Sequence, residues 1–356
     1  MSDDIFSKLF ELFDQPGPIN WKLAAEVTRH LSGEPEPVEP WAAEEFRELA
    51  RLAEYRIEQI APFRVIPASD VIAVDARGWT DRNLETFGSL VEPFASSVAA
   101  DGPAAPLMAQ LSPAIIGLQV GSLVGALSTW VVASFDAGLP QEHPGPLTVI
   151  VPNIIELTRS SGQDEREVRL WVVANEVAFR AVSQLPWIAD HLHQLASAYA
   201  GAVKIDPTLL SGLMAGGSDP VAIEQAIDEA GGLEGIIGGE EAVAPRLELE
   251  AFLGAITGCA RLLARRAIGE LSTEFDQISA HRDRAREEAQ TAPTIGMGPV
   301  PAEATQLGDA FNQEVERRYG DDALETLWAD PSRMPTASEL RDPTAWAARV
   351  LLDGWS

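Results

Sequence analysis

Helical periodicity dominates the pattern of hydrophobic and polar positions along this chain. Apolar residues recur every three to four positions over residues 2–14, again from about Asn20 to Leu31, and again over roughly 41–61, which predicts three amphipathic helices. The polar face of the first helix is acidic and suits no lipid surface, so we expect it to dock on the protein's own core. A Pro/Glu-rich linker at 33–40 separates the second helix from the third.

Residues 115–135 contain no charged side chain, and Gly117, Gly121 and Gly125 recur at four-residue spacing, which permits close helix–helix approach. The length alone would allow a membrane span. Polar side chains interrupt the stretch, however, and no Lys or Arg occurs between Arg82 and Arg159 to set a topology. We therefore expect a buried core helix.

The second half of the pattern centres on two strongly apolar helices. A β-branched run at 146–151 predicts one of few strands, and Asp164 with Glu167 predicts a capping box that opens a helix over 164–185, apolar nearly all round. A second apolar helix is expected from Leu247 to about Leu271. The predicted fold class is therefore mainly α, a multi-helix domain with at most a small β element.

Glycine, proline and charge indicate how the chain is organised. We expect an N-terminal helical region at 1–140 and a second region at 141–356, integrated into one domain. Within the second region, residues 206–245 are Gly-rich and acidic and predict a mobile insertion, and residues 282–303 predict an exposed, flexible linker.

Composition restricts the partners. The chain of 356 residues carries 26 basic and 54 acidic side chains, a formal net charge of −28. This field repels phosphate backbones and anionic membranes, so neither nucleic acid nor membrane is an expected partner. Hydrophobic residues make up 46% of the chain, enough for a sizeable core. The single Cys259 excludes an intrachain disulfide, and with no signal-peptide pattern we expect a cytoplasmic protein.

The helix over 164–185 contains the run WVVANEVAF, followed by Pro186 and Trp187. This run resembles the zincin-like metallopeptidase family of actinobacteria and their relatives, hydrolases and zinc-dependent metalloproteases whose members show WV-x-x-HEVTH followed by PW at this place. The resemblance extends over most of the chain, through the segments PGPINWKLA, VPNIIEL, LGDAF and WADPSRMP. It implies a zincin-like fold, a zinc cofactor and hydrolysis of peptides.

The residues that would bind zinc depart from the family pattern. In H-E-x-x-H, two His one helical turn apart hold Zn²⁺, and the Glu is the general base for the metal-bound water. Asn175 and Phe179 occupy the two His positions here, while Glu176 keeps the base position. The third ligand of the family, a Glu in a later helix, aligns with Thr257. We therefore predict a degenerate site that holds no zinc.

Each remnant of the motif has a structural interpretation beside the functional one. Glu176 is either a relic base or, as we favour, the partner of Arg180 in an i,i+4 ion pair. Asn175 binds a ligand carbonyl or caps a backbone group, and Phe179 fills the volume of the lost metal. Trp187, His191 and Arg180 are candidates for a neighbouring cleft.

No other chemistry replaces the motif. His191 and His193 lie two residues apart on a predicted helix and cannot chelate together there, and Cys259 lies in an apolar helix without a neighbouring base. The function predicted is that of an inactive zincin-like protein that binds a peptide or protein. The alternatives are a hydrolase that uses Glu176 as general base in a non-standard site, and an assembly protein whose acidic segment 218–250 meets a basic partner.

Overall fold

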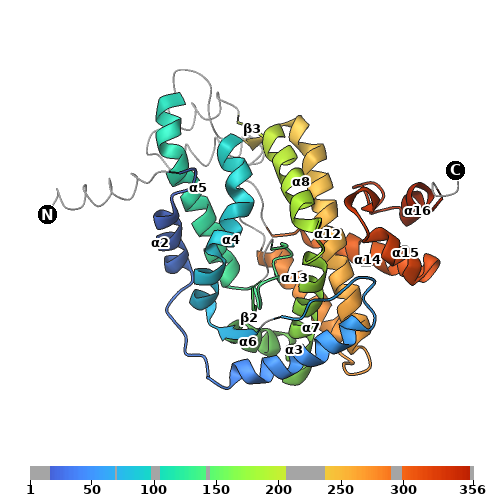
Figure 1. The fold of residues 1–356 in the computed structure, drawn as a ribbon. Helices are drawn as coiled ribbons and strands as arrows, with labels where there is room; N and C mark the ends of the chain where they lie inside the picture. Colours follow the sequence, from blue (N-terminus) through green and yellow to red (C-terminus); the bar gives the residue numbers. More distant parts are fainter. Residues whose placement is uncertain are drawn as a thin grey trace.

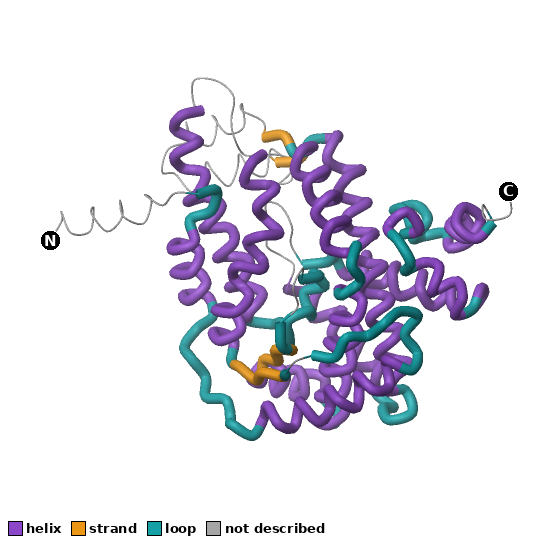
Figure 2. Tube along the Cα trace, in the orientation of Figure 1, coloured by secondary structure: helices purple, strands orange, loops and turns teal. Residues whose placement is uncertain are grey.

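The computed structural model of the chain describes residues 17–68, 70–97, 105–141, 145–205, 237–289 and 299–352. Its architecture is mainly helical, as predicted, with long helices packed side by side and two short strand pairs at opposite ends of the molecule (Figures 1 and 2). The helix predicted over 2–14 and most of the insertion predicted over 206–245 lie outside the described residues.

The described elements of the N-terminal half are α2 (Trp21–Leu31), α3 (Ala42–Glu58), β1 (Val71–Val74), α4 (Ala76–Ser97), α5 (Ala105–Ser128) and β2 (Leu147–Ile150). They are followed by α6 (Val151–Ser161), α7 (Glu165–Ser183), α8 (Ile188–Ala202), β3 (Lys204–Ile205) and β4 (Ile237–Gly238). The C-terminal part holds α12 (Glu240–Ile268), α13 (Phe275–Ala289), α14 (Ala302–Tyr319), α15 (Asp321–Leu327), the 3₁₀ turn η1 (Pro331–Arg333) and α16 (Pro343–Leu351).

The helices α7 and α12 lie inside the molecule. In α7, 14 of the 19 residues are buried, and in α12 the run from Ala251 to Ala264 is buried without interruption. A helix that is apolar nearly all round gains most by being covered on every side, so these two become the core against which α3, α8 and α14 pack. This confirms the two apolar helices predicted from the sequence.

Glycines allow two pairs of helices to approach with their backbones in contact. A Cβ on Gly117 would lie 2.4 Å from the Asn20 carbonyl oxygen, and one on Gly121 would lie 2.5 Å from that of Ala24. The glycine spacing therefore seats α5 against α2, as the small-residue pattern predicts. Gly258 does the same between α12 and α14, where an added Cβ would lie 2.1 Å from the carbonyl carbon of Gly308.

A small parallel sheet positions one loop beside α7. β1 and β2 pair in parallel with Val71 opposite Leu147, and β2 is buried along its whole length. On its other side β2 meets the segment after α5, where Ser134 N donates to Thr148 O (3.0 Å) and Ile150 N donates to Val132 O (2.8 Å). These bonds fix residues 132–136 next to the centre of α7.

Two sequence predictions are wrong in their boundaries. The core helix predicted over 115–135 ends at Ser128, because the apolar residues that follow pair with β2 instead of continuing the helix. Residues 282–289 do not form a linker but the second half of α13, and Arg282 and Arg286 there are buried. None of the described helices is both long enough and apolar enough to cross a membrane.

Candidate functional site

The predicted motif lies at the middle of α7. The helix begins after Asp164, whose Oδ1 accepts hydrogen bonds from the backbone amides of Arg166 (2.9 Å) and Glu167 (3.3 Å). Only half of the predicted capping box forms, since the Asp164 amide donates to Glu274 (3.1 Å) and not to Glu167. From this start, Asn175, Glu176 and Phe179 fall where α7 faces α12 and the loop at 132–136.

The carboxylate of Glu176 is buried, and its contacts correct one prediction. It is 3% exposed and accepts hydrogen bonds from the backbone amide of Phe135, at 3.0 Å to Oε1 and 3.2 Å to Oε2. The ion pair predicted between Glu176 and Arg180 does not form. Arg180 instead donates to the carbonyl oxygen of Gly145 (2.6 Å), and the carboxylate whose charge acts on it is that of Glu54.

Burial raises the pKa of Glu176 well above its ordinary value, and the negative charge of Asp136 raises it further. The backbone amides of Phe135 and Ser134 oppose this increase only in part. A carboxyl group in these surroundings is held in its protonated form over a wider pH range than an exposed Glu.

The other motif positions make contacts within the core and along their own helices. The Phe179 ring is 4% exposed and stacks on the Phe135 ring, with centroids 5.2 Å apart and planes 17° from parallel. The Asn175 amide donates to the Trp171 carbonyl oxygen (2.8 Å), and the Thr257 hydroxyl donates to that of Leu253 (2.8 Å).

These side chains do not fit the zinc ion that the resemblance implies. Phe179 has no atom that can bind a metal, and Asn175 and Thr257 offer only neutral oxygen atoms in place of the His and Glu ligands that zinc prefers. Among the described residues, no three His, Cys, Asp or Glu side chains gather where a metal ion could be held.

The four motif positions nevertheless line one cavity, of about 40 Å³. Asn175, Glu176 and Phe179 reach it from α7, and Thr257 reaches it from α12. The placement of Thr257 opposite the α7 motif agrees with the alignment made from the sequence. Around the rest of the cavity stand Val132, Phe135, Asp136, Trp171, Val172, Ala260, Arg261, Arg282 and Arg286.

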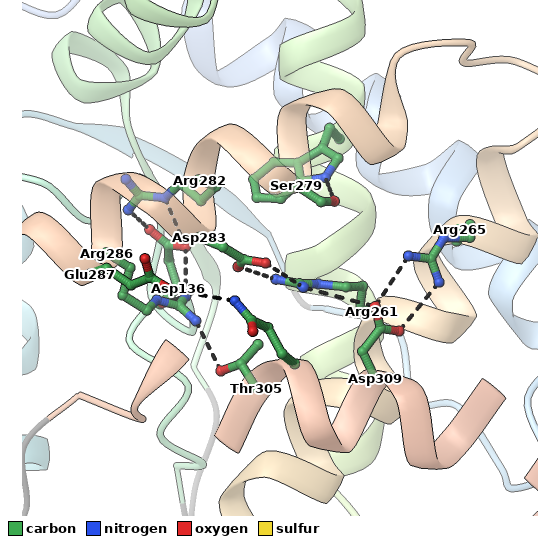
Figure 3. A network of polar contacts seen from close by, with 12 residues as sticks. Asp136, Arg261, Arg265, Ser279, Arg282, Asp283, Arg286, Glu287, Thr305 and Asp309 are labelled. Atoms are coloured by element: carbon green, nitrogen blue, oxygen red, sulfur yellow. Dashed lines mark hydrogen bonds and ion pairs between the residues drawn. The ribbon is translucent and has the colours of Figure 1, made fainter. Parts of the chain in front are cut away.

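The sequence analysis did not predict the charged side of this cavity, formed by Asp136, Arg261, Arg282 and Arg286, which we call the charged wall. Asp136 makes ion pairs with Arg282 and Arg286 of α13, and Val132 N also donates to it (3.0 Å). Arg261 of α12 forms a bidentate pair with Asp283, at 2.9 and 2.7 Å. Figure 3 shows the two sets of pairs in one view, the first extending from Arg286 to Thr305 and the second extending to Asp309 and Arg265.

One signal for this wall was present in the sequence. Arg261 and Arg265, like Arg282 and Arg286, stand four residues apart and so share one face of their helices. The guanidinium carbon of Arg282 also lies over the Trp130 ring, 4.8 Å from its centroid, and Arg282 donates to the Trp130 carbonyl oxygen (2.8 Å). The spacing alone does not show that these charges are buried.

Trp187 and His191 belong to a different cluster. Trp187 stacks on Trp328 with centroids 6.4 Å apart, and His191 meets the edge of Phe252 at 4.9 Å. Burial lowers the pKa of His191, with a hydrogen bond to Gln194 opposing it. Trp187, His191 and Arg180 are not among the residues that line the cavity. Cys259 is buried, and burial raises its pKa, which disfavours the thiolate.

Comparison with known proteins gives a family and a fold. The profile of the zincin-like metallopeptidase family matches residues 19–347. A crystal structure of a putative hydrolase with a novel fold from Chloroflexus aurantiacus is similar, with a TM-score of 0.64 and 22% sequence identity. The match covers 95% of this chain and 100% of that one, and it shows a shared fold. No significant match was found among curated proteins.

Proposed function

The chain belongs to the zincin-like metallopeptidase family, and from its altered site we propose that it acts by binding a peptide or protein and does not cleave peptides through zinc. The observation that carries the proposal is the Phe179 ring. At the position where the motif H-E-x-x-H places its second His, an aromatic side chain stacks on Phe135. A side chain that packs in the core therefore stands where the motif would have a metal ligand.

Two further observations support the proposal. Glu176 keeps the position of the general base, but its carboxylate accepts the backbone amide of Phe135. Arg261, Arg282 and Arg286 line the same cavity, and their positive charge disfavours a divalent cation there. Neither feature suits the activation of a metal-bound water.

A hydrolase that uses Glu176 as base without zinc is the second candidate. It is favoured by one observation, a buried carboxyl with a strongly raised pKa beside a small polar cavity, which is typical of acid–base sites. Among the described residues that line the cavity, the one hydroxyl is that of Thr257, and it donates to the carbonyl oxygen of Leu253. We therefore rank this candidate second.

Metal content and peptide fate separate the two functions. We expect protein purified without chelator to carry well under one zinc per chain by elemental mass spectrometry. We also expect peptides selected from a displayed library on the immobilised protein to be recovered at their intact mass. Stoichiometric zinc, or metal-dependent cleavage that Glu176→Gln abolishes, would overturn the proposal. Cleavage that is independent of metal but lost in Glu176→Gln would establish the second candidate.

A further inference from the structure

The cavity at the altered motif is surrounded by an unusual concentration of buried positive charge. Arg261, Arg282 and Arg286 all line it, and their side chains are only 8%, 5% and 4% exposed. Burying a guanidinium group costs free energy unless it is paired and hydrogen-bonded. The partners available to these three groups therefore decide what the cavity can hold.

One aspartate has to serve two of these arginines. Asp136 pairs with both Arg282 and Arg286. Arg261 pairs with Asp283 at 2.7 Å and lies 3.9 Å from Asp309. Glu176 lines the cavity too, yet its hydrogen bonds go to the Phe135 amide. At the cavity wall, Arg282 and Arg286 thus share a single carboxylate.

One donor in this wall has no acceptor among the described residues. The Nε atom of Arg286 is buried and makes no hydrogen bond there, whereas Nη1 of the same side chain donates to Thr305 (3.3 Å) and Nη2 donates to the Asp136 carbonyl oxygen. A buried charged donor without an acceptor is costly, and an acceptor inside the cavity would remove that cost. Burial lowers the pKa of Arg286, the negative charges of Asp136 and Asp283 oppose this decrease, and the positive charges of Arg282 and Arg261 add to it.

The size of the cavity limits the ligand to a few atoms. By this measure a cavity needs about 10–15 Å³ to hold one water molecule. At about 40 Å³ the cavity holds a few waters, or in their place a halide ion or a single carboxylate group. A sulfate or a larger anion with its hydrogen-bonding shell does not fit as readily.

We propose that the cavity that replaces the zinc site is a binding site for one small monovalent anion, a halide or a carboxylate group, held by Arg286 with Arg282 and Arg261. The substitutions at Asn175, Phe179 and Thr257 thus accompany a reversal of charge preference, from a cation to an anion. This inference does not rest on peptide binding, and either can fail without the other.

Thermal unfolding at constant ionic strength tests the site. The reference buffer contains gluconate, which is too large to enter the cavity. In the test buffers, chloride, bromide or formate replaces the gluconate. We expect a rise in Tm that saturates with the concentration of the small anion, because a ligand of the folded state stabilises it. A larger effect of formate than of chloride identifies a carboxylate site, and the reverse identifies a halide site. A Tm that is the same in all four anions overturns the proposal.

Arg286→Lys separates this site from general salt effects. It keeps the positive charge but removes Nε, and we expect the apparent affinity for the small anion to fall about tenfold or more, the effect of losing a hydrogen bond to a charged group. Arg266→Lys is the matched control, because Arg266 lies on α12 and pairs with Glu316 and Asp321 outside the cavity. Equal losses in both variants contradict the proposal.

Crystals of the unaltered protein provide a test that does not depend on any variant folding. After a bromide soak, we expect an anomalous peak inside the cavity, beside Nε of Arg286. Peaks confined to the protein surface, with ordered water in the cavity, would overturn the assignment.

Discussion

Two buried carboxyl groups line the same cavity, and their surroundings shift their pKa values in opposite directions. Glu176 lies between the Phe135 amide and the Phe179 ring, and burial together with the charge of Asp136 raises its pKa. Burial acts on Asp136 in the same sense, but the charges of Arg282 and Arg286 outweigh it and lower the pKa of Asp136. The surroundings of Glu176, the apolar wall of Phe135 and Phe179, therefore favour its protonated form, and the charged wall favours the ionised form of Asp136.

The two sides of the cavity are therefore built differently. On the apolar wall, the Phe179 ring stacks on the Phe135 ring. On the charged wall, an ion-pair network joins the loop after α5 to α13, as Figure 3 shows. A ligand that enters the cavity meets the Glu176 carboxyl group and the Phe179 ring on one side. On the other side it meets the guanidinium groups of the charged wall. The predictions below test each wall, beginning with the largest effect.

Removing Asp136 should damage the protein most. Asp136→Ala leaves Arg282 and Arg286 buried without their shared carboxylate, and breaking a buried pair in this way typically costs about 3–5 kcal/mol. Denaturant unfolding measures the loss. The control is Glu156→Gln, which removes an exposed pair with Arg159 and should cost less than about 1 kcal/mol. Similar losses in the two variants would mean that the charged wall contributes little.

Altering the apolar wall should have the next largest effect. Phe179→His places an imidazole where a ring now stacks on Phe135, and we expect a loss of about 2–4 kcal/mol in the free energy of unfolding. Phe179→Leu, which stays apolar, should lose less. If Phe179→His, alone or with Asn175→His, is as stable as the parent, the ring is not part of the packing.

The pH dependence of stability should reveal Glu176 by its sign. Because the pKa of Glu176 is higher in the folded than in the unfolded state, its contribution is fully present below its unfolded pKa and is lost as pH rises through its folded pKa. Glu176→Gln removes this loss, so the variant should gain stability over the parent with rising pH. Asp136 has the opposite sign, and its contribution is lost as the pH falls.

Unfolding curves between acid and neutral pH test the assignment of Glu176. Arg282 and Arg286, which act on Asp136, stay protonated throughout this range, and Asp136, whose charge acts on Glu176, has a lowered pKa. A difference between parent and Glu176→Gln that does not change with pH would show that the carboxyl does not titrate as argued.

The smallest effect is expected at Thr257, between the two walls. Its hydroxyl donates to the carbonyl oxygen of Leu253 in the same helix, so Thr257→Val should change the free energy of unfolding by no more than about 1 kcal/mol. Anion binding should also be unchanged. A large loss of either would give Thr257 a role beyond that hydrogen bond.

Much of the fold follows from local patterns. The periodicity at Trp21–Leu31, the cap at Asp164 and the β-branched run at 147–150 each predict an element that the structure contains. The glycines of α5 predict its close contact with α2. These features were predictable because each depends on the spacing of residues within one segment.

The site could be predicted only in part. The motif alignment identified Asn175, Glu176, Phe179 and Thr257, and the structure brings all four to one cavity. The charged wall was missed because its pairs join residues that are 146 and 150 positions apart, which no local pattern shows. The prediction of a Glu176–Arg180 ion pair was wrong. The four-residue spacing would allow the pair, but the Glu176 carboxyl group accepts a hydrogen bond from the Phe135 amide instead.

The position of Asp136 has a consequence for how the molecule can be divided. This residue precedes the boundary expected at 140, whereas the two arginines that it neutralises follow that boundary by more than a hundred residues. A fragment that begins at residue 141 would contain both guanidinium groups and lack their counter-ion. We therefore expect such a fragment to be less stable than the same residues are within the whole chain, because two buried guanidinium groups would lose their shared carboxylate.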